Sequence, residues 1–342
     1  MAIGAGIAMM ATGCSGPAQS SPPSPTATAT QTVPPSPTPT PTPMEIAPLR
    51  GTEVPAGSLD HASIAAKIDN QILARPQVGL ESADIVFEEL VEGGITRYLA
   101  IWHSSIPEEL GPVRSIRPMD PLIISPFGGI MCYSGGQHRF LVLIQAAPVY
   151  NCVHGAADTA SVFYRTKSKA APHNVILKAQ DLLALHPDLK APKQQFDYSA
   201  DLSSSSAVVS GTETQKLSFV FSTTSKPSWT YDSGRQLFLR DQRGVKDVDS
   251  EGAQLTATNV IALRVGITNL AGNVPKTELV GGGEAWVSAG GSTVHGKWTK
   301  ASSGDTIHLV DESGSPIELA PGNTWIELVP TAGSVAFSPP AS

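Results

Sequence analysis

The spacing of hydrophobic residues divides the chain into an N-terminal stretch and two folded parts. The first dozen residues are apolar or small, and few branched aliphatic side chains follow before Ile46. From there to residue 205, short apolar runs alternate with turn residues, whereas over residues 213–331 apolar and polar positions mostly alternate one by one. Because a period of two is typical of half-buried strands, the second folded part is predicted to be a β domain.

The first folded part, residues 46–205, is predicted to be a mixed α/β domain. Strands are expected at Ser63–Asp69, Ile85–Val91, Ile95–His103 and Ile130–Tyr133. The pair Gly93-Gly94 is a hairpin signal between the second and third of these strands. Helices are expected at His138–Ala146 and at Val175–Leu185, the latter with Asn174 as its cap.

The second folded part, residues 213–331, is predicted to be an antiparallel β-rich domain, which makes the fold class α+β. Its strands are expected at Leu217–Ser222, Gln236–Arg240, Asn259–Gly266, Gly283–Ser288, Ser292–Trp298, Thr306–Val310 and Thr324–Val329. Turns rich in Gly, Asp and Ser separate them. The tryptophans of this part are expected in its core, and they are Trp229, Trp286, Trp298 and Trp325.

Charge argues against a nucleic-acid partner. The chain has 23 Lys and Arg residues against 30 Asp and Glu residues, a net charge of −7 at pH 7. Its basic residues form no cluster long enough to follow a phosphate backbone. After the first dozen residues, no apolar run approaches the roughly 18 residues that a membrane-spanning helix needs.

Residues 1–14 are predicted to be a lipoprotein signal peptide. Small residues precede a cysteine at the close of the apolar stretch, in Ala11-Thr12-Gly13-Cys14. This arrangement resembles the lipobox, in which the cysteine receives a diacylglyceryl group. Ala11 replaces the usual leucine and no Lys or Arg precedes the apolar run, so we expect the start codon further upstream. An ordinary cleaved signal is the alternative interpretation.

Residues 15–45 are predicted to be a disordered tether. Between Gly16 and Pro43 the chain consists mainly of Pro, Thr, Ser and Ala and carries no charge, so it cannot bury enough apolar surface to offset its ordering entropy. Repeated Pro-Thr pairs favour extended backbone, with a reach on the order of 90 Å. With a lipid on Cys14, this predicts a body anchored to the extracellular face of the cytoplasmic membrane.

Motifs in both folded parts resemble the YerB-type bacterial lipoprotein family. They are Ile68-Asp69-Asn70, Ala74–Leu80, Ala83–Arg97, Gly111–Pro118, Ala171–Asn174, Asn259-Val260, Gly281–Gly283, Gly296–Trp298 and Pro321–Trp325. The resemblance extends from about Leu49 to Pro330. It implies an N-terminal mixed α/β domain, a C-terminal β-rich domain and an envelope location, but it implies no reaction, because the family is one of unknown biochemical function.

The loop Gly111–Pro118 is the strongest candidate for ligand binding. It carries Arg114 and Arg117 between rigid proline-containing ends, and the planar guanidinium group matches the oxygens of a carboxylate or phosphate. Asp69 and the pair His173-Asn174 are the further ligand-binding candidates. The alternative is that the two arginines pair internally with the acidic run Glu88, Glu89 and Glu92, of which the first two should face opposite sides of a strand.

A catalytic site is a second possibility. His173 is suited to act as a general acid or base with Glu88 or Glu92, although it could equally satisfy a loop carbonyl while Asn174 caps the helix. The sequence has no Gly-x-Ser-x-Gly nucleophile motif and no His at zinc-ligand spacing, so we expect no metal and no cofactor.

The cysteine count is odd, which suits one lipidated residue and one pair. Cys132 and Cys152 are expected to form a disulfide worth about 3 kcal/mol, with two buried free thiols as the alternative. Three functions remain open. They are binding of an anionic wall polymer or envelope protein, a wall-active hydrolase or lyase, and a surface scaffold without a site.

Overall fold

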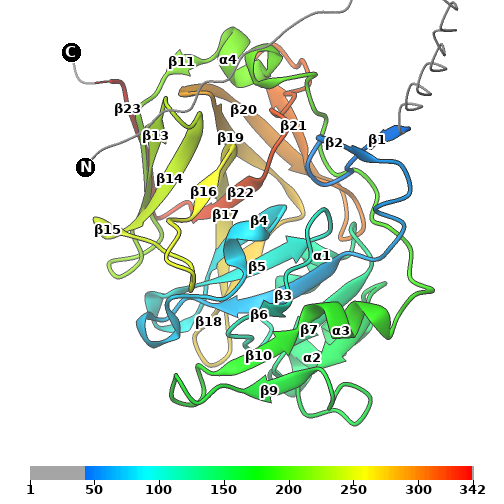
Figure 1. Ribbon diagram of the computed structural model, residues 1–342. Helices are drawn as coiled ribbons and strands as arrows, with labels where there is room; N and C mark the ends of the chain where they lie inside the picture. The colour runs from blue at the N-terminus through cyan, green and yellow to red at the C-terminus, as the bar shows by residue number, and fades with distance from the viewer. Residues whose placement is uncertain (1–42, 341–342) are drawn as a thin grey trace, which may run out of the picture. The chain divides into compact units, whose positions relative to one another are not determined.

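Residues 43–340 are described by the computed structural model, and β-strands dominate them (Figure 1). The strands before residue 205 are β1 (Met44–Ile46), β2 (Glu53–Pro55), β3 (Ile64–Asp69), β4 (Ile85–Leu90), β5 (Thr96–Trp102), β6 (Glu109–Leu110), β7 (Ile130–Tyr133), β8 (Tyr150–Val153), β9 (Phe163–Arg165) and β10 (Val175–Lys178). The helices are α1 (Asp120–Ile124), α2 (His138–Gln145), α3 (Ala179–Ala184) and α4 (Ser206–Ser210), with short 3-10 turns η1 (Ile72–Ala74), η2 (Leu80–Ser82), η3 (Glu92–Gly94) and η4 (Leu202–Ser204).

The second half of the chain supplies the remaining strands. They are β11 (Thr212–Glu213), β12 (Lys216–Val220), β13 (Pro227–Asp232), β14 (Leu237–Gln242), β15 (Val245–Lys246), β16 (Thr256–Ala257), β17 (Asn259–Leu270), β18 (Val274–Glu278), β19 (Gly281–Ala289), β20 (Ser292–Lys300), β21 (His308–Asp311), β22 (Thr324–Pro330) and β23 (Ser334–Ser338).

One 12-stranded sheet runs through both halves of the chain. Its main path is β11-β20-β19-β17-β22-β4-β5-β3-β7-β8. The junction is made by β22, which pairs in parallel with β17 on one side and with β4 on the other, with Thr324 opposite Ile85. Figure 1 shows this red strand beside the cyan β4. The two sequence parts therefore share a continuous hydrogen-bonded sheet.

Alternation along β4 and β5 sends neighbouring side chains to opposite faces of this sheet. Phe87 packs in the hydrophobic core on one face, together with side chains of α1 and α2. Val86 packs in a second core on the other face, which includes the buried tryptophans Trp229 and Trp325. Glu88 and Glu89 also point to opposite faces, as the sequence predicted. Glu88 bonds to Arg240 on the side of the second core, whereas Glu89 pairs with Lys67 on the other side.

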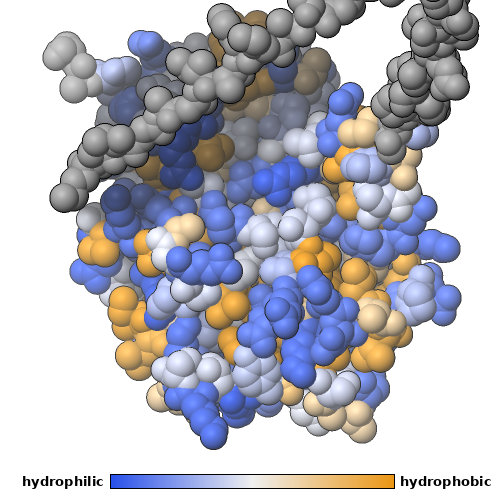
Figure 2. Space-filling model, viewed as in Figure 1, coloured by the Kyte–Doolittle hydropathy of each residue, from blue (hydrophilic) through white to orange (hydrophobic). Residues whose placement is uncertain are grey.

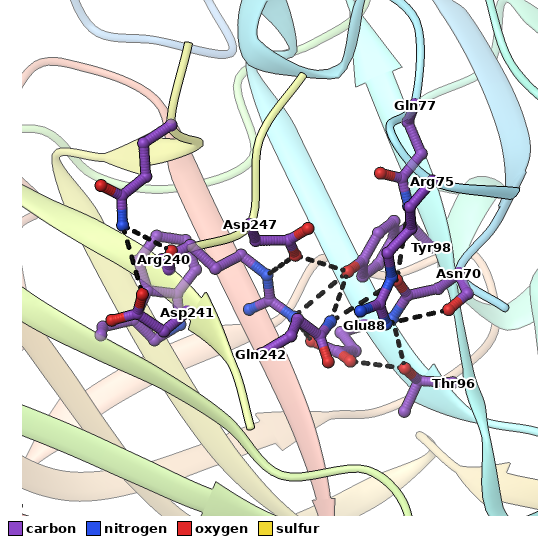
Figure 3. A network of polar contacts seen from close by, with 12 residues as sticks. Asn70, Arg75, Gln77, Glu88, Thr96, Tyr98, Arg240, Asp241, Gln242 and Asp247 are labelled. Carbon is purple, nitrogen blue, oxygen red and sulfur yellow. Dashed lines mark hydrogen bonds and ion pairs between the residues drawn. The ribbon is translucent and has the colours of Figure 1, made fainter. Parts of the chain in front are cut away.

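A six-stranded sheet, with the path β15-β14-β13-β12-β23 and β16 beside β14, packs over the second core. Arg240 of β14 reaches from it into the large sheet and is fully buried (Figure 3). Its guanidinium donates to Glu88 at 2.5 Å, to Asp247 at 3.0 Å and to Glu327 at 3.0 Å. It also lies 4.7 Å from the ring centre of Trp325. Three carboxylates around one cation thus connect the two sheets.

Most of the predicted elements are confirmed, with small shifts at their ends. All the strands predicted in the second part are present, and Trp229, Trp298 and Trp325 are buried while Trp286 is half-buried. The exception to the antiparallel prediction is β22, which has parallel partners on both sides. Strands β11, β13, β15, β16, β18 and β23 were not predicted, and β23 lies beyond the predicted end at residue 331.

The predicted helix at Val175–Leu185 is wrong in its first part. Val175–Lys178 is strand β10, paired with β6 and β9, and only Ala179–Ala184 is helical. The run Val175-Ile176-Leu177 contains β-branched residues that favour a strand when pairing partners are available. The helices α1, α2 and α3 have 5, 8 and 6 residues, so the first half is β-rich with short helices.

Among residues 43–340, no helix is long and apolar enough to cross a membrane. On the face drawn in Figure 2, polar and apolar side chains are interspersed in small areas. The predicted signal peptide, with Cys14, and nearly all of the predicted tether lie outside the described residues.

Candidate anion-binding site

The predicted arginine loop runs along the end of β3 and is fixed by its own backbone. Asp69 N–H donates to the Pro112 carbonyl at 2.9 Å, and Arg114 N–H donates to the Lys67 carbonyl at 2.8 Å. Further along the loop, Ile116 N–H donates to the Gly135 carbonyl at 3.0 Å. The loop is therefore held against two neighbouring segments by backbone hydrogen bonds. This agrees with the rigid loop that its prolines predicted, and it fixes the backbone that carries Arg114 and Arg117.

Asp69 brings two of the predicted ligand-binding residues together. Its Oδ2 lies 3.0 Å from Nε of Arg114 and 2.6 Å from Nδ1 of His173. Its Oδ1 accepts a hydrogen bond from the backbone N–H of Gln71 at 3.1 Å. Because the same carboxylate oxygen holds both partners, the imidazole and the Arg114 guanidinium are adjacent. The Asp69 side chain is only 1% exposed, whereas those of Arg114 and His173 reach solvent at 18% and 13%.

Arg117 is paired with an acidic residue of the predicted run. Its Nε donates to Oε2 of Glu92 at 2.6 Å, and its Nη1 donates to the Ile116 carbonyl at 2.8 Å. Burial alone would raise the pKa of Glu92, but the hydrogen bond and charge of Arg117 outweigh it and lower that pKa. The alternative of internal ion pairing is thus correct for Arg117 and Glu92, while Arg114 pairs with Asp69 instead.

Arg97 is a third guanidinium at this place, and the sequence did not predict it as a site residue. It stands opposite Asp69 in the pairing of β3 with β5 and donates from Nη1 to the Ser115 carbonyl at 2.7 Å, inside the arginine loop. Arg97 is 5% exposed, and no salt bridge to it is present among the described residues. Its buried Nε has no hydrogen-bond partner. The signal for it in the sequence is a charged residue on the inward side of an otherwise apolar strand.

These side chains form what we call the arginine cluster, which comprises Asp69, Glu92, Arg97, Arg114, Arg117 and His173. Three guanidinium groups stand against two carboxylates, so the cluster has a positive excess even when His173 is neutral. Burial, followed by the charges of Arg117 and Arg114, lowers the pKa of Arg97 to about 10. The charges of Asp69 and Glu92 oppose this lowering only in part, so an added anion would make the charged form of Arg97 less costly.

A buried ionic group lies beneath the cluster. Lys67 of β3 donates to Oδ1 of Asp120 at 2.8 Å and also pairs with Glu89. Burial lowers the pKa of Lys67 to about 8, although the charge of Asp120 opposes that shift. The other oxygen of Asp120 accepts the backbone N–H of Arg117 at 2.5 Å. This group therefore fixes the position of the loop from below.

Three hollows of the protein lie away from the arginine cluster. Two of them, with volumes of about 690 and 560 Å³, lie along the segment that connects the two halves of the chain, and Gln194 lines both. No residue of the arginine cluster lines either hollow. A third, of about 330 Å³, lies between Gln194–Asp197 and Thr306–Val310. Within the cluster, the side chains of Arg114 and His173 reach solvent, so a charged group of a larger ligand would contact these two first.

Two residues predicted near the site have other roles. Glu88 lies on the opposite face of the sheet, fully buried against Arg240, so the prediction that it takes part in catalysis with His173 is wrong. Asn174 does not cap a helix, because a strand follows it. Its Oδ1 instead accepts from Arg165 at 2.8 Å, and its Nδ2 donates to the Thr166 carbonyl at 3.2 Å, which holds the segment that carries His173.

The predicted disulfide is not formed in the structure. Cys132 and Cys152 are opposite each other on the parallel strands β7 and β8, but both are free thiols and fully buried. Burial and the neighbouring thiol raise the pKa of Cys132 well above its ordinary value. The alternative interpretation, two buried thiols, describes the structure. Within residues 43–340, no group of His, Cys, Asp and Glu is arranged to hold a metal ion.

Comparison with known proteins places the whole body in one family. A family model described as "Protein of unknown function (DUF3048) N-terminal domain" matches residues 49–193, and the C-terminal domain of the same family matches residues 217–326. "Putative lipoprotein YerB" of Bacillus subtilis (strain 168) is 27% identical over 298 residues, which is 85% of this chain and 88% of that protein.

The fold is also that of a solved relative. The crystal structure of YerB protein from Bacillus subtilis superposes with a TM-score of 0.74 at 25% identity, covering 85% of this chain and 99% of the other. The sequence motifs, both family models, the relative and the shared fold all agree, and the chain belongs to the two-domain YerB-type family.

Proposed function

We propose that this protein is a lipid-anchored protein of the bacterial envelope that binds an anionic group at the arginine cluster. The anchor would be Cys14, the tether residues 15–45, and the location the extracellular face of the cytoplasmic membrane. The lipobox-like sequence and the lipoprotein name of the relative support the anchor. A wall polymer bearing phosphate or carboxylate groups, or an acidic surface of an envelope protein, is the expected partner.

The observation that carries the binding proposal is the Nε of Arg97, which has no hydrogen-bond partner. Its guanidinium is almost fully buried, yet its Nε has no acceptor and its Nη1 has only a neutral carbonyl. A buried charge is ordinarily paired, because its desolvation is costly. The Nε edge of a guanidinium is also the edge that binds an oxyanion with two parallel hydrogen bonds. An anionic ligand would supply the missing partner.

Anion binding is tested by the unfolding temperature of the full-length protein. Sodium phosphate should raise it relative to sodium chloride of the same ionic strength, by an amount that corresponds to about 2.7 kcal/mol at a phosphate concentration 100 times the dissociation constant. Arg97→Lys keeps the positive charge but loses the planar guanidinium that can donate two parallel hydrogen bonds, so this variant should lose most of the stabilisation by phosphate. Arg235→Ala, in an exposed turn, is the matched control. Equal stabilisation of Arg97→Lys and wild type would refute the proposal.

The anchor is tested separately. In a bacterial host with working lipidation, labelled palmitate should enter the full-length protein and should not enter Cys14→Ser. If both proteins take up label equally, or neither does, the lipid is not on Cys14 and the proposed location has lost its support.

A further inference from the structure

His173 is held in one tautomer by Asp69. The Asp69 carboxylate lies beside the Arg114 guanidinium and accepts the backbone N–H of Gln71, and a carboxylate only accepts hydrogen bonds. Nδ1 of His173, 2.6 Å from Oδ2, must therefore carry a proton. In the neutral imidazole, Nε2 is then the unprotonated nitrogen. It has no hydrogen-bond partner among residues 43–340, which leaves it free to take a proton from a ligand.

The groups beside this base are suited to a phosphate that gains charge. The Arg114 guanidinium contacts the same oxygen of Asp69 as His173 does, and its Nη1 donates to the carbonyl of Pro172 at 3.2 Å. Because Pro172 directly precedes His173, the guanidinium lies next to the imidazole. Arg97, which is opposite Asp69 in the pairing of β3 with β5, adds a further positive charge to this place. Fixed cationic donors of this kind stabilise the additional negative charge of a phosphoryl transition state more strongly than they stabilise the ground state.

No side chain of the described residues is placed to act as the nucleophile. No hydroxyl or thiol in residues 43–340 hydrogen-bonds to Nε2 of His173. The attacking oxygen must therefore belong to the substrate or to water. A hydroxyl on the carbon next to the phosphate ester is already close to the phosphorus. Its attack therefore avoids the entropy loss that a second molecule, such as water, would have to pay.

We infer that the arginine cluster cleaves phosphodiesters that carry a neighbouring hydroxyl, with Nε2 of His173 as the general base. This inference rests on the anion binding proposed above. The hydroxyl gives its proton to Nε2 while its oxygen bonds to phosphorus, and the bond from phosphorus to the leaving oxygen breaks. The imidazolium then returns the proton to that oxygen. The products are a cyclic phosphodiester and an alcohol, with no change in oxidation state.

The test uses the full-length protein and the chromogenic diester hydroxypropyl para-nitrophenyl phosphate. Release of nitrophenolate should exceed the buffer rate, and methyl para-nitrophenyl phosphate, which lacks the hydroxyl, should be cleaved far more slowly. His173→Ala should lower the rate by about 100-fold or more, the contribution typical of a general base. Added imidazole should restore part of the lost rate in His173→Ala, which a merely structural role would not produce. Arg235→Ala should match wild type.

Two results would overturn the inference. The first is wild-type cleavage no faster than buffer while phosphate still raises the unfolding temperature, in which case anion binding stands and catalysis falls. The second is equal cleavage by wild type and His173→Ala. A failure of phosphate to bind would instead remove the proposed function and this inference together. His173→Gln, which keeps a donor for Asp69, replaces His173→Ala if that variant does not show a folding transition.

Discussion

Removing the Arg240 guanidinium should destabilise the protein more than any surface change. In Arg240→Met, three buried carboxylates lose their shared cation, and they belong to Glu88, Asp247 and Glu327. Breaking one buried ion pair from one side costs about 3–5 kcal/mol, because the remaining charge stays desolvated. We expect a loss of at least that size, against a total stability of about 5–15 kcal/mol for a native protein. The matched control is Arg235→Met, which makes the same change at an exposed position.

The dependence of this loss on pH gives a second, independent readout. Burial and the charge of Glu88 raise the pKa of Glu327 well above its ordinary value, while Arg240 lowers it. Removing Arg240 therefore raises that pKa further, and the folded variant takes up a proton more readily than its unfolded chain. A carboxyl with a raised pKa in the folded state favours folding at low pH, and this advantage is lost as the pH rises through the folded value. The difference in stability between variant and wild type should narrow as the pH falls.

Urea unfolding followed by tryptophan fluorescence measures both effects, since Trp229 and Trp325 stack against Arg240. Free energies of unfolding are compared for wild type, Arg240→Met and Arg235→Met at neutral and mildly acidic pH. The reasoning is refuted if the two variants differ by less than about 0.5 kcal/mol, the usual spread of surface substitutions. It is also refuted if the loss for Arg240→Met grows as the pH falls.

Three further predictions follow from other contacts. Cys132 and Cys152 should react with iodoacetamide only after unfolding, and identical masses of alkylated protein with and without prior reductant would confirm that they are free. Burial and the charge of His61 lower the pKa of His103, so the histidine binds a proton more readily in the unfolded chain than in the folded protein, and the free energy of unfolding should fall as the pH drops below 6.5. Urea unfolding of His103→Asn should show a smaller fall, and the same dependence on pH in this variant and in wild type would contradict the prediction. Asp249→Ala should cost about 1–2 kcal/mol in thermal unfolding, because its carboxylate accepts the backbone N–H of Leu80 at 2.9 Å; a variant as stable as wild type would show that this contact does not hold the two halves together.

The sequence predicts those parts of the fold that local periodicity determines. The β4–β5 hairpin and its two faces follow from alternation around Gly93-Gly94, and the longer strands of the second half, such as β17, β19, β20 and β22, follow from the same period. The stretch Val175–Leu185 shows the limit of this reasoning. A short apolar run is compatible with a strand or a helix, and here the decision depends on pairing with β6 and β9, which are distant in the sequence.

Long-range contacts set the same limit for the site. Residue type and loop rigidity indicated Arg114, Arg117 and His173, but nothing local shows that Asp69 would hold two of them. Arg97 lies in β5, whose sequence pattern is that of a buried strand and gives no indication of a binding residue. Its signal, a charged residue in an apolar strand, recurs at Arg240, which is paired with carboxylates, whereas Arg97 donates only to a backbone carbonyl. Periodicity shows which face an arginine occupies, whereas only the tertiary structure shows whether its charge is already neutralised.

The position of β22 between β17 and β4 has a consequence for how the protein is made. During synthesis β4 leaves the ribosome long before its neighbour β22, because most of the other strands lie between them in the sequence. Until then the edge of β4 exposes N–H and C=O groups with no ladder to join, an arrangement prone to wrong pairing. A nascent chain thus cannot complete its central sheet until β22 has emerged, and if the protein is exported as proposed, the sheet stays incomplete until that strand is made.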